Sequence, residues 1–289
     1  MSRKRIVIYA CVFACLSLLV LAALGLRRVP RMLGEHSYRA GMRHLNAGRY
    51  PEAAAAFRQA SLFMPRRPRP YIDLGDAFLR MENYGEAGDA FRRALSLKQD
   101  SCAYCGLGAV YYRTGRYEEA ERVFRRAKEL SPNDGCAYDW SGNMFYELGR
   151  YEEAAEAFEH EVRIKPRAVF PLHFLGNSYG YLGRWEESAE IYRRIIELQP
   201  DYEDAHMQLG FAYFSLKQYR DAVGSYRRAL ELKADDGRAV YGLALAHAAL
   251  GETRSAAAYH ERLRGLDPAS AAELSKQLGT STAASGKIR

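Results

Sequence analysis

Apolar residues recur three and four positions apart along most of the chain, which is the spacing of one face of an α-helix. In residues 101–113 this face carries Tyr104, Leu107, Gly108 and Tyr111. A glycine soon afterwards ends the pattern, and residues 117–130 repeat the spacing until a proline stops it. The pattern therefore predicts two helices joined by a short turn.

This two-helix pattern returns at a fixed interval. Pro132, Pro166 and Pro200 are 34 residues apart. The same steps separate turn glycines and aromatic residues, namely Gly48, Gly115, Gly149, Gly183, Gly251, Tyr50, Tyr84, Tyr117, Tyr151, Trp185 and Tyr219. One interval is 33, because a residue is missing near 98–101. A period of this length indicates stacked repeats.

Small residues hold the same phase as the turns. In the first predicted helix of each repeat they are Gly41, Gly75, Gly108, Gly142, Gly176 and Gly210; in the second they are Ala53, Ala87, Ala120, Ala154, Ala222 and Ala256. They mark places where helices approach closely. One hairpin cannot bury its own apolar face, so neighbouring hairpins must stack into a solenoid.

The repeats resemble the tetratricopeptide repeat (TPR) family, in the form of a membrane-anchored protein of bacterial type. The family pattern aromatic-x2-L-G-x2-Y, A-x3-F and P is met by Tyr104, Leu107, Gly108, Tyr111, Ala120, Phe124 and Pro132. The resemblance implies an all-α, right-handed α-solenoid of about seven repeats. Their expected bounds are 34–67, 68–100, 101–134, 135–168, 169–202, 203–236 and 237–270. A capping helix at 270–278 and a disordered tail are expected within 271–289.

Residues 6–26 form an apolar run without a charged side chain. As a helix it would be roughly 31 Å long at about 1.5 Å per residue, which matches a hydrocarbon core of about 30 Å. We expect one transmembrane anchor here, between a basic tail at 1–5 and a basic linker at 27–33. Two alternative interpretations of this segment remain. It could be an ordinary cleaved signal peptide, because Ala23 and Gly25 suit a cleavage site, or a lipoprotein signal, because VFAC at Cys15 loosely resembles a lipoprotein box.

The net charge of +7 belongs mostly to this N-terminal segment. Six of its positive charges precede residue 34, whereas the remaining chain has 36 Lys and Arg against 35 Asp and Glu. A nucleic-acid partner therefore has little electrostatic support. The basic tail favours a cytoplasmic N-terminus and a periplasmic or extracytoplasmic repeat body, although basic residues after the run nearly balance it.

Arginine pairs recur on the second helices, at residues 92–93, 125–126, 193–194 and 227–228. Glutamates stand one or two turns earlier in several of the same helices. This arrangement is typical of a solvated helix face with ion pairs three or four residues apart.

In the TPR family the first helices line a concave groove through their second, fifth, ninth and twelfth residues. The resemblance implies groove residues Tyr112, Asp139, Asn143, Tyr146, His173, Asn177, Phe211 and Phe214, with Tyr181 beside them. Rings offer contact area and asparagine offers both a donor and an acceptor, which suits an extended or short helical peptide. The alternative is that many of these rings pack between neighbouring helices.

Relatives that grip acidic chaperone tails carry Lys or Arg at the fifth residue of the first helix. Here the fifth residues of repeats one to six are Tyr38, Ile72, Cys105, Asp139, His173 and Met207. The chain therefore lacks that carboxylate clamp, and we exclude a chaperone-tail adaptor.

Cys102, Cys105 and Cys136 form a possible thiol site. A thiol at a helix N-terminus can have a lowered pKa, which favours reactivity. Cys105 and Cys136 both occupy inferred groove positions and could pair in an oxidising compartment. Inert packing is the third reading, since no second CxxC or spaced histidine completes a zinc site.

No nucleophile elbow, phosphate loop, HExxH or dinucleotide fingerprint occurs in the sequence. We therefore expect no enzyme, no cofactor, no metal and no small-molecule substrate. The predicted function is a membrane-tethered scaffold that binds a protein or peptide partner. The alternative is a membrane-tethered thiol-handling or cytochrome-maturation factor that uses the three cysteines.

Overall fold

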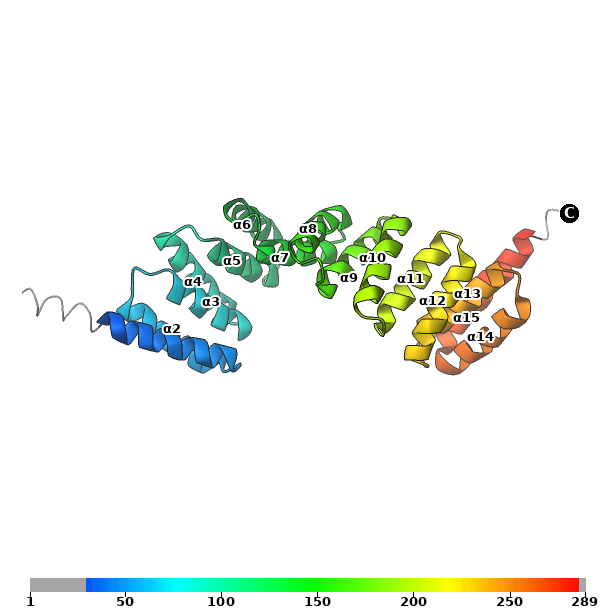
Figure 1. The fold of residues 1–289 in the computed structure, drawn as a ribbon, viewed down its shortest axis with the longest axis horizontal. Helices are drawn as coiled ribbons and strands as arrows, with labels where there is room; N and C mark the ends of the chain where they lie inside the picture. Colours follow the sequence, from blue (N-terminus) through cyan, green and yellow to red (C-terminus); the bar gives the residue numbers. More distant parts are fainter. Residues whose placement is uncertain (1–29, 286–289) are drawn as a thin grey trace, which may run out of the picture. The chain divides into compact units, whose positions relative to one another are not determined.

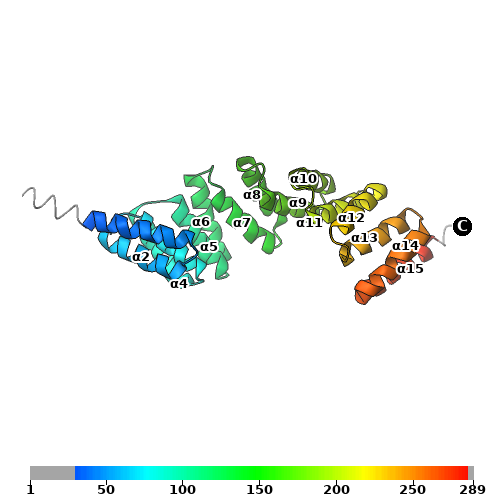
Figure 2. The same ribbon diagram turned by 60° about the horizontal axis from the view of Figure 1, so that its bottom comes forward.

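The computed structural model describes residues 30–285, and within that range every regular element is helical, with no β-strand. The chain divides into two compact units, with the boundary after Trp140. In each unit consecutive helices pack against each other in chain order (Figures 1 and 2). The predicted all-α repeat fold is confirmed.

The helices of the first unit are one over residues 30–46, α2 (Tyr50–Phe63), α3 (Arg69–Arg80), α4 (Tyr84–Leu97), α5 (Ser101–Arg113) and α6 (Tyr117–Leu130). The boundary falls inside α7 (Gly135–Glu147). The second unit continues with α8 (Tyr151–Ile164), α9 (Val169–Tyr181), α10 (Trp185–Leu198), α11 (Glu203–Ser215), α12 (Tyr219–Leu232), α13 (Gly237–Ala249), α14 (Thr253–Leu266) and α15 (Pro268–Ser285). Odd-numbered helices up to α13 are the first helices of the repeats.

An aromatic ring on the second helix of each of six repeats lies against a glycine of the first. The pairs are Gly41–Phe57, Gly75–Phe91, Gly108–Phe124, Gly142–Phe158, Gly176–Tyr192 and Gly210–Tyr226. A Cβ built on these glycines would stand 2.4–2.9 Å from a ring atom, so no larger residue fits. Every ring is at most 3% exposed. This contact closes each hairpin.

The turn between the two helices of a repeat contains one residue with positive φ. Five of these residues are glycines with φ between 71° and 77°, at positions 48, 115, 149, 183 and 251. Glu82 and Lys217 hold the place in the other two turns, with φ of 60° and 62°. The backbone therefore keeps one turn geometry where the glycine pattern is interrupted.

The missing residue falls in a loop between two repeats. Three residues, 98–100, separate α4 from α5, whereas four, 131–134, separate α6 from α7. Asp100 caps α5 by accepting hydrogen bonds from the backbone N–H groups of Cys102 and Ala103. The deletion leaves both helices whole.

The C-terminal helix covers the apolar end of the repeats. Ala271 and Leu274 on α15 are at most 2% exposed and pack with Val240 and Leu263. The predicted cap helix at 270–278 lies within α15, which continues to Ser285. The helix thus enters the stretch expected to be a disordered tail, because residues 280–285 contain neither proline nor glycine.

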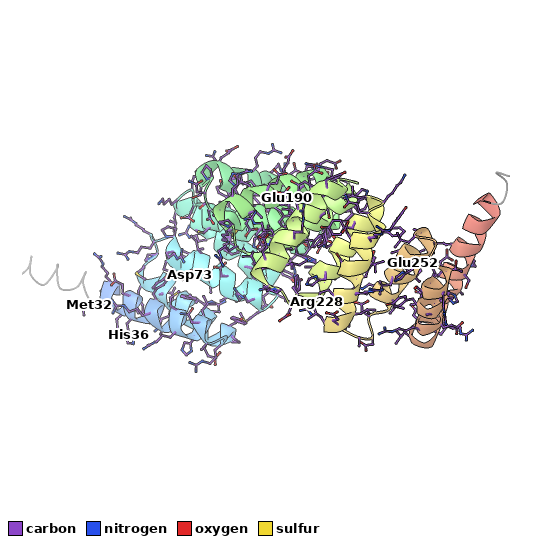
Figure 3. The ribbon with its side chains drawn as sticks, turned by 45° about the vertical axis from the view of Figure 1, so that its right-hand side comes forward. Met32, His36, Asp73, Glu190, Arg228 and Glu252 are labelled. Atoms are coloured by element: carbon purple, nitrogen blue, oxygen red, sulfur yellow. A yellow bond between two sulfur atoms is a disulfide. The ribbon has the colours of Figure 1, made fainter. Side chains whose placement is uncertain are left out.

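Ion pairs three or four residues apart line the second helices, but the glutamates that pair with Arg126 and Arg228 follow these arginines, whereas the charge pattern predicted glutamates before them. Arg126 contacts Glu129 at 2.7 Å, and Arg228 contacts Glu231 at 2.9 Å and Asp201 at 3.1 Å. Figure 3 labels Arg228 and another outer side chain, Glu190. Exposed pairs of this kind add little stability, because water screens them, and their main effect is to keep the surface solvated.

Between residues 30 and 285 no helix is both long and apolar enough to cross a membrane. The predicted anchor at 6–26 lies outside the described residues.

Replacing Gly210 with alanine should destabilise the protein by about 1–3 kcal/mol, because the new Cβ would meet the Tyr226 ring at 2.7 Å. Gly224→Ala is the matched control on the facing helix α12, since nothing lies within 4 Å of its Cβ position. It should stabilise by roughly 0.5–1 kcal/mol through helix propensity. Urea unfolding measures both. Equal effects of the two substitutions would contradict the ring–glycine contact.

Candidate functional site

The nine predicted groove residues lie on first helices of both units. Tyr112 on α5 and Asp139 on α7 belong to the first unit, and the other seven belong to the second. Tyr112 packs beside Tyr117 and Trp140, with ring centroids 6.4 and 6.0 Å away. Asp139 and Asn143 are half-buried on α7. The second unit brings the remaining residues together.

Aromatic rings gather on α7, α8 and α9 of the second unit. Tyr146 lies edge-on to Phe174 at 5.1 Å and to Tyr181 at 5.9 Å. Tyr181 stacks on Tyr151 at 4.3 Å, with the rings 6° from parallel. Phe170, 4.8 Å from Phe174, is 53% exposed and Tyr181 is 63% exposed. We call these five residues the aromatic cluster.

Asn177 is the centre of a polar network beside this cluster. Its Oδ1 accepts hydrogen bonds from Tyr192 Oη at 2.5 Å and Gln208 Nε2 at 3.2 Å. Its Nδ2 therefore donates to His173 Nε2 at 3.0 Å. That assignment places the proton of neutral His173 on Nδ1, which lies 3.6 Å from Asp204 Oδ2. The network fixes both predicted residues, His173 and Asn177.

The protonation of this network follows from its burial. Burial lowers the pKa of His173, and the nearby Asp204 carboxylate opposes that effect. Burial also raises the pKa of Tyr192. The His173 imidazole is thus neutral and accepts a hydrogen bond from Asn177, and the Tyr192 hydroxyl keeps its proton and donates one to Asn177.

A cavity of about 470 Å³ opens beside the network. Its lining includes the rings of Tyr181, Trp185 and Phe211 and the amides of Asn177 and Gln208. Trp185 lies edge-on to Phe211, with centroids 5.4 Å apart. Rings and amides together suit a chain that carries both side chains and backbone polar groups.

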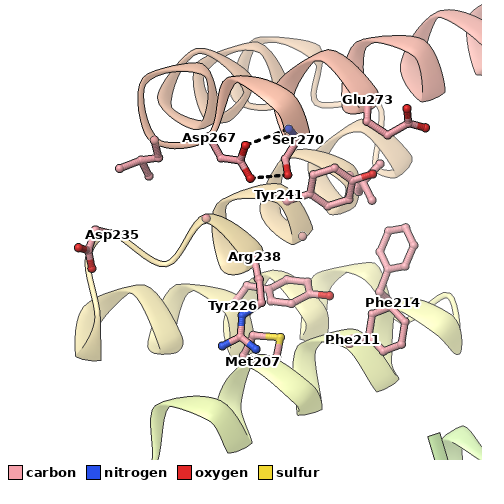
Figure 4. Close-up of a pocket in the computed structure, with 14 residues that line it drawn as sticks. Met207, Phe211, Phe214, Tyr226, Asp235, Arg238, Tyr241, Asp267, Ser270 and Glu273 are labelled. Atoms are coloured by element: carbon pink, nitrogen blue, oxygen red, sulfur yellow. Dashed lines mark hydrogen bonds between the residues drawn. The ribbon is translucent and has the colours of Figure 1, made fainter. Parts of the chain in front are cut away.

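A larger cavity of about 760 Å³ lies among α11, α13 and α15 (Figure 4). Phe211 and Phe214 line it from α11, and Tyr241 and Leu245 line it from α13. Because Phe211 also lines the smaller cavity, the two cavities adjoin along α11.

Arg238, which lines the larger cavity, is held by three carboxyl groups. Its guanidinium nitrogens lie 3.0 Å from Asp236, 3.4 Å from Asp204 and 3.8 Å from Glu203. Burial, then the hydrogen bond with Asp236, raises the pKa of Glu203 to about 7. Burial alone would raise the pKa of Asp236, but hydrogen bonds from Glu203 and Arg238 lower it. Glu203 therefore carries the proton that the two carboxyl groups share.

The three cysteines separate into a pair and a single thiol. Cys105 and Cys136 form a disulfide that joins α5 to α7, with Cα atoms 6.5 Å apart, and Cys102 is a free, exposed thiol. The expectation of a lowered pKa at Cys102 is wrong: burial, with Asp100 and Asp134, raises it. Cys102 and Cys136 line a cavity of about 510 Å³ in the first unit. The described residues hold no cluster suited to a metal ion.

Sequence reasoning missed Tyr192, Gln208 and Trp185 as parts of the site. Tyr192 takes the place that phenylalanine holds in the first four repeats, so its hydroxyl was the available signal. Gln208 directly follows Met207, which is a predicted groove position. The direction of the Gln208 side chain depends on how α9 and α11 pack. Trp185 begins a second helix, outside the predicted groove positions.

The stacked hairpins and their ring- and amide-lined surface define a helical-repeat protein of the tetratricopeptide class. The chain belongs to the TPR family described as cilia and flagella-associated protein 70 C-terminal domain, which matches residues 20–243. No curated protein sequence matches the chain.

Several solved TPR structures share the fold. The C-terminal part of a TPR protein from Cytophaga hutchinsonii is 18% identical, with a TM-score of 0.68 over 82% of this chain and 98% of that one. YrrB, described as a TPR protein with an unusual peptide-binding site, is 22% identical, with a TM-score of 0.59 over 65% and 98%. MamA is 20% identical, with a TM-score of 0.52 over 60% and 97%. At these identities the likeness concerns the fold.

Tyr192→Phe should destabilise the protein by about 0.5–1.5 kcal/mol, because it removes the hydroxyl that donates to Asn177. The ring itself fits, since phenylalanine fills this place in other repeats. Tyr226→Phe, at the same place in the next repeat, is the control, because the Tyr226 hydroxyl makes no hydrogen bond to the described residues. Chemical unfolding should separate the two. Indistinguishable values would contradict the network.

Glu203 should make stability fall as the pH rises from 5 to 8. Its pKa in the folded protein, about 7, exceeds the usual 4.5, so the fold favours the protonated form. That stabilisation is lost as the pH rises from about 4.5 to about 7, and above pH 7 it is gone. Lys233 and Arg238 face the same carboxyl and moderate the loss. Thermal unfolding across this range should show the midpoint of the wild type falling relative to that of Glu203→Gln as the pH rises. A pH-independent difference would refute the assignment.

Proposed function

We propose that the chain is a non-enzymatic scaffold that binds an extended or short helical segment of a partner protein along α9 and α11. The observation that carries this proposal is the exposure of large rings on these two helices. Phe170, Tyr181 and Phe211 are 53%, 63% and 48% exposed within one unit. Contiguous apolar surface of this kind is typical of an interaction site.

Polar groups beside the rings suit a peptide backbone. The three internal hydrogen bonds of Asn177 leave one N–H on Nδ2 and hold the amide in a fixed direction. Gln208 Oε1 remains as an acceptor on the wall of the same cavity. The description of YrrB as a TPR protein with a peptide-binding site supports this kind of ligand by analogy of fold.

The scaffold is held at a membrane through residues 6–26, with the N-terminus in the cytoplasm and the repeats outside it. This part of the proposal rests on the length and apolarity of that run and on the basic residues before it. A thiol-handling role is disfavoured, because a disulfide occupies Cys105 and Cys136 and the pKa of Cys102 is raised.

Photo-crosslinking in the cells that produce the protein tests the proposal. A benzophenone amino acid in place of Tyr181 should yield a discrete adduct with a partner protein, because that ring is exposed beside the cavity. The same amino acid in place of Glu190, an exposed residue on α10, is the matched control and should yield none.

Equal adducts from both positions, or none from Tyr181, would refute binding along α9 and α11. The same cells test the membrane attachment. The full chain should stay with membranes in alkaline carbonate, and a chain without residues 6–26 should be released. Release of the full chain would contradict the anchor.

A further inference from the structure

The larger cavity of the second unit has apolar walls and an acidic edge. Met207 and Phe214 come from α11, and Tyr241 and Leu245 come from α13 (Figure 4). Its volume of about 760 Å³ lies within the usual range of ligand pockets, roughly 300–1,000 Å³, so a few side chains fill it. Phe211 at the edge is 48% exposed and offers uncovered apolar surface to an occupant.

The charged side chains that line this cavity are Asp235, Asp267, Glu273 and Arg238. Arg238 already contacts the carboxyl groups of Asp236, Asp204 and Glu203, so its positive charge is largely neutralised. An acidic ligand would therefore meet three carboxylates and one arginine whose charge is already balanced.

Two of the lining carboxylates are available to a cation. Asp267 is used at the start of α15, where it accepts hydrogen bonds from the backbone and hydroxyl of Ser270. Asp235 is exposed and makes no hydrogen bond or ion pair with the described residues. Glu273 has only a loose contact with the exposed Lys276, at 3.6 Å. Asp235 and Glu273 line the cavity from different segments, the α12–α13 loop and α15 (Figure 4).

We propose that this cavity binds a partner segment in which basic and apolar side chains alternate. Apolar side chains of the segment enter between Met207, Phe214 and Leu245, and its basic side chains pair with Asp235 and Glu273. Charge complementarity selects this occupant over an acidic one, because like charges placed together cost free energy. The inference rests on the proposed function and adds the chemistry of the partner to it.

Three fluorescent hexapeptides test the inference, with the full chain in phosphatidylcholine nanodiscs and empty nanodiscs as the blank. One peptide alternates leucine and lysine, one leucine and glutamate, and one serine and lysine. Fluorescence anisotropy at low salt should show at least tenfold tighter binding of the leucine–lysine peptide than of the other two. Its affinity should fall as salt is added.

Two double variants locate the binding. Asp235→Asn with Glu273→Gln should weaken the leucine–lysine peptide about threefold to tenfold. Glu186→Gln with Glu190→Gln removes the same charge from exposed positions on α10 and should change nothing. Phe211→Ala should also weaken binding of the leucine–lysine peptide. Circular dichroism checks that every variant is folded.

Equal binding of the leucine–glutamate peptide, or equal loss in both double variants, would overturn the inference. If the peptide fails to bind while Tyr181 still crosslinks to a partner, the scaffold stands and the assigned charge is wrong. If the peptide binds at the cavity and Tyr181 yields no adduct, binding along α9 and α11 fails and the acidic cavity stands.

Discussion

The contact between an aromatic ring and a glycine holds six of the hairpins together, and in places it also joins neighbouring hairpins. Phe91 lies against Gly75 of its own repeat and Gly106 of the next, and Tyr226 lies likewise against Gly210 and Gly242. The ring therefore fills the space among three helices, where a single added methyl group has no room. Because the same contact recurs at the repeat period, it sets how each of these first helices packs against its second helix.

The candidate site lies where large rings are exposed. First helices of the second unit carry the rings of Phe170, Tyr181 and Phe211, each of which is about half exposed or more. The polar network under these rings directs the Asn177 amide, and the two cavities adjoin along α11. Rigid hairpins thus present rings, amides and carboxylates in fixed places, which lowers the ordering entropy that binding would otherwise cost.

The sequence was sufficient for features that depend on spacing along one helix or one period. Helices α5 and α6, the turn at Gly115 and the shortened loop before Ser101 all follow from it. The sequence was insufficient where the packing of two helices determines which way a side chain points. Gln208 reaches Asn177 only because of how α9 and α11 pack. The larger cavity depends on α15, which lies beyond the repeat pattern, and on loop carboxylates that no helical period orients.

The ring position has a consequence for how such a surface can diverge. Phenylalanine at this buried place only fills space, whereas Tyr192 adds a hydroxyl that passes beneath the first helix and holds Asn177. One oxygen atom on the second helix therefore changes the hydrogen-bonding character of the surface on the first. A substitution at the buried ring position of one repeat can therefore change the hydrogen bonds that its surface offers to a ligand, while every residue that touches the ligand stays the same.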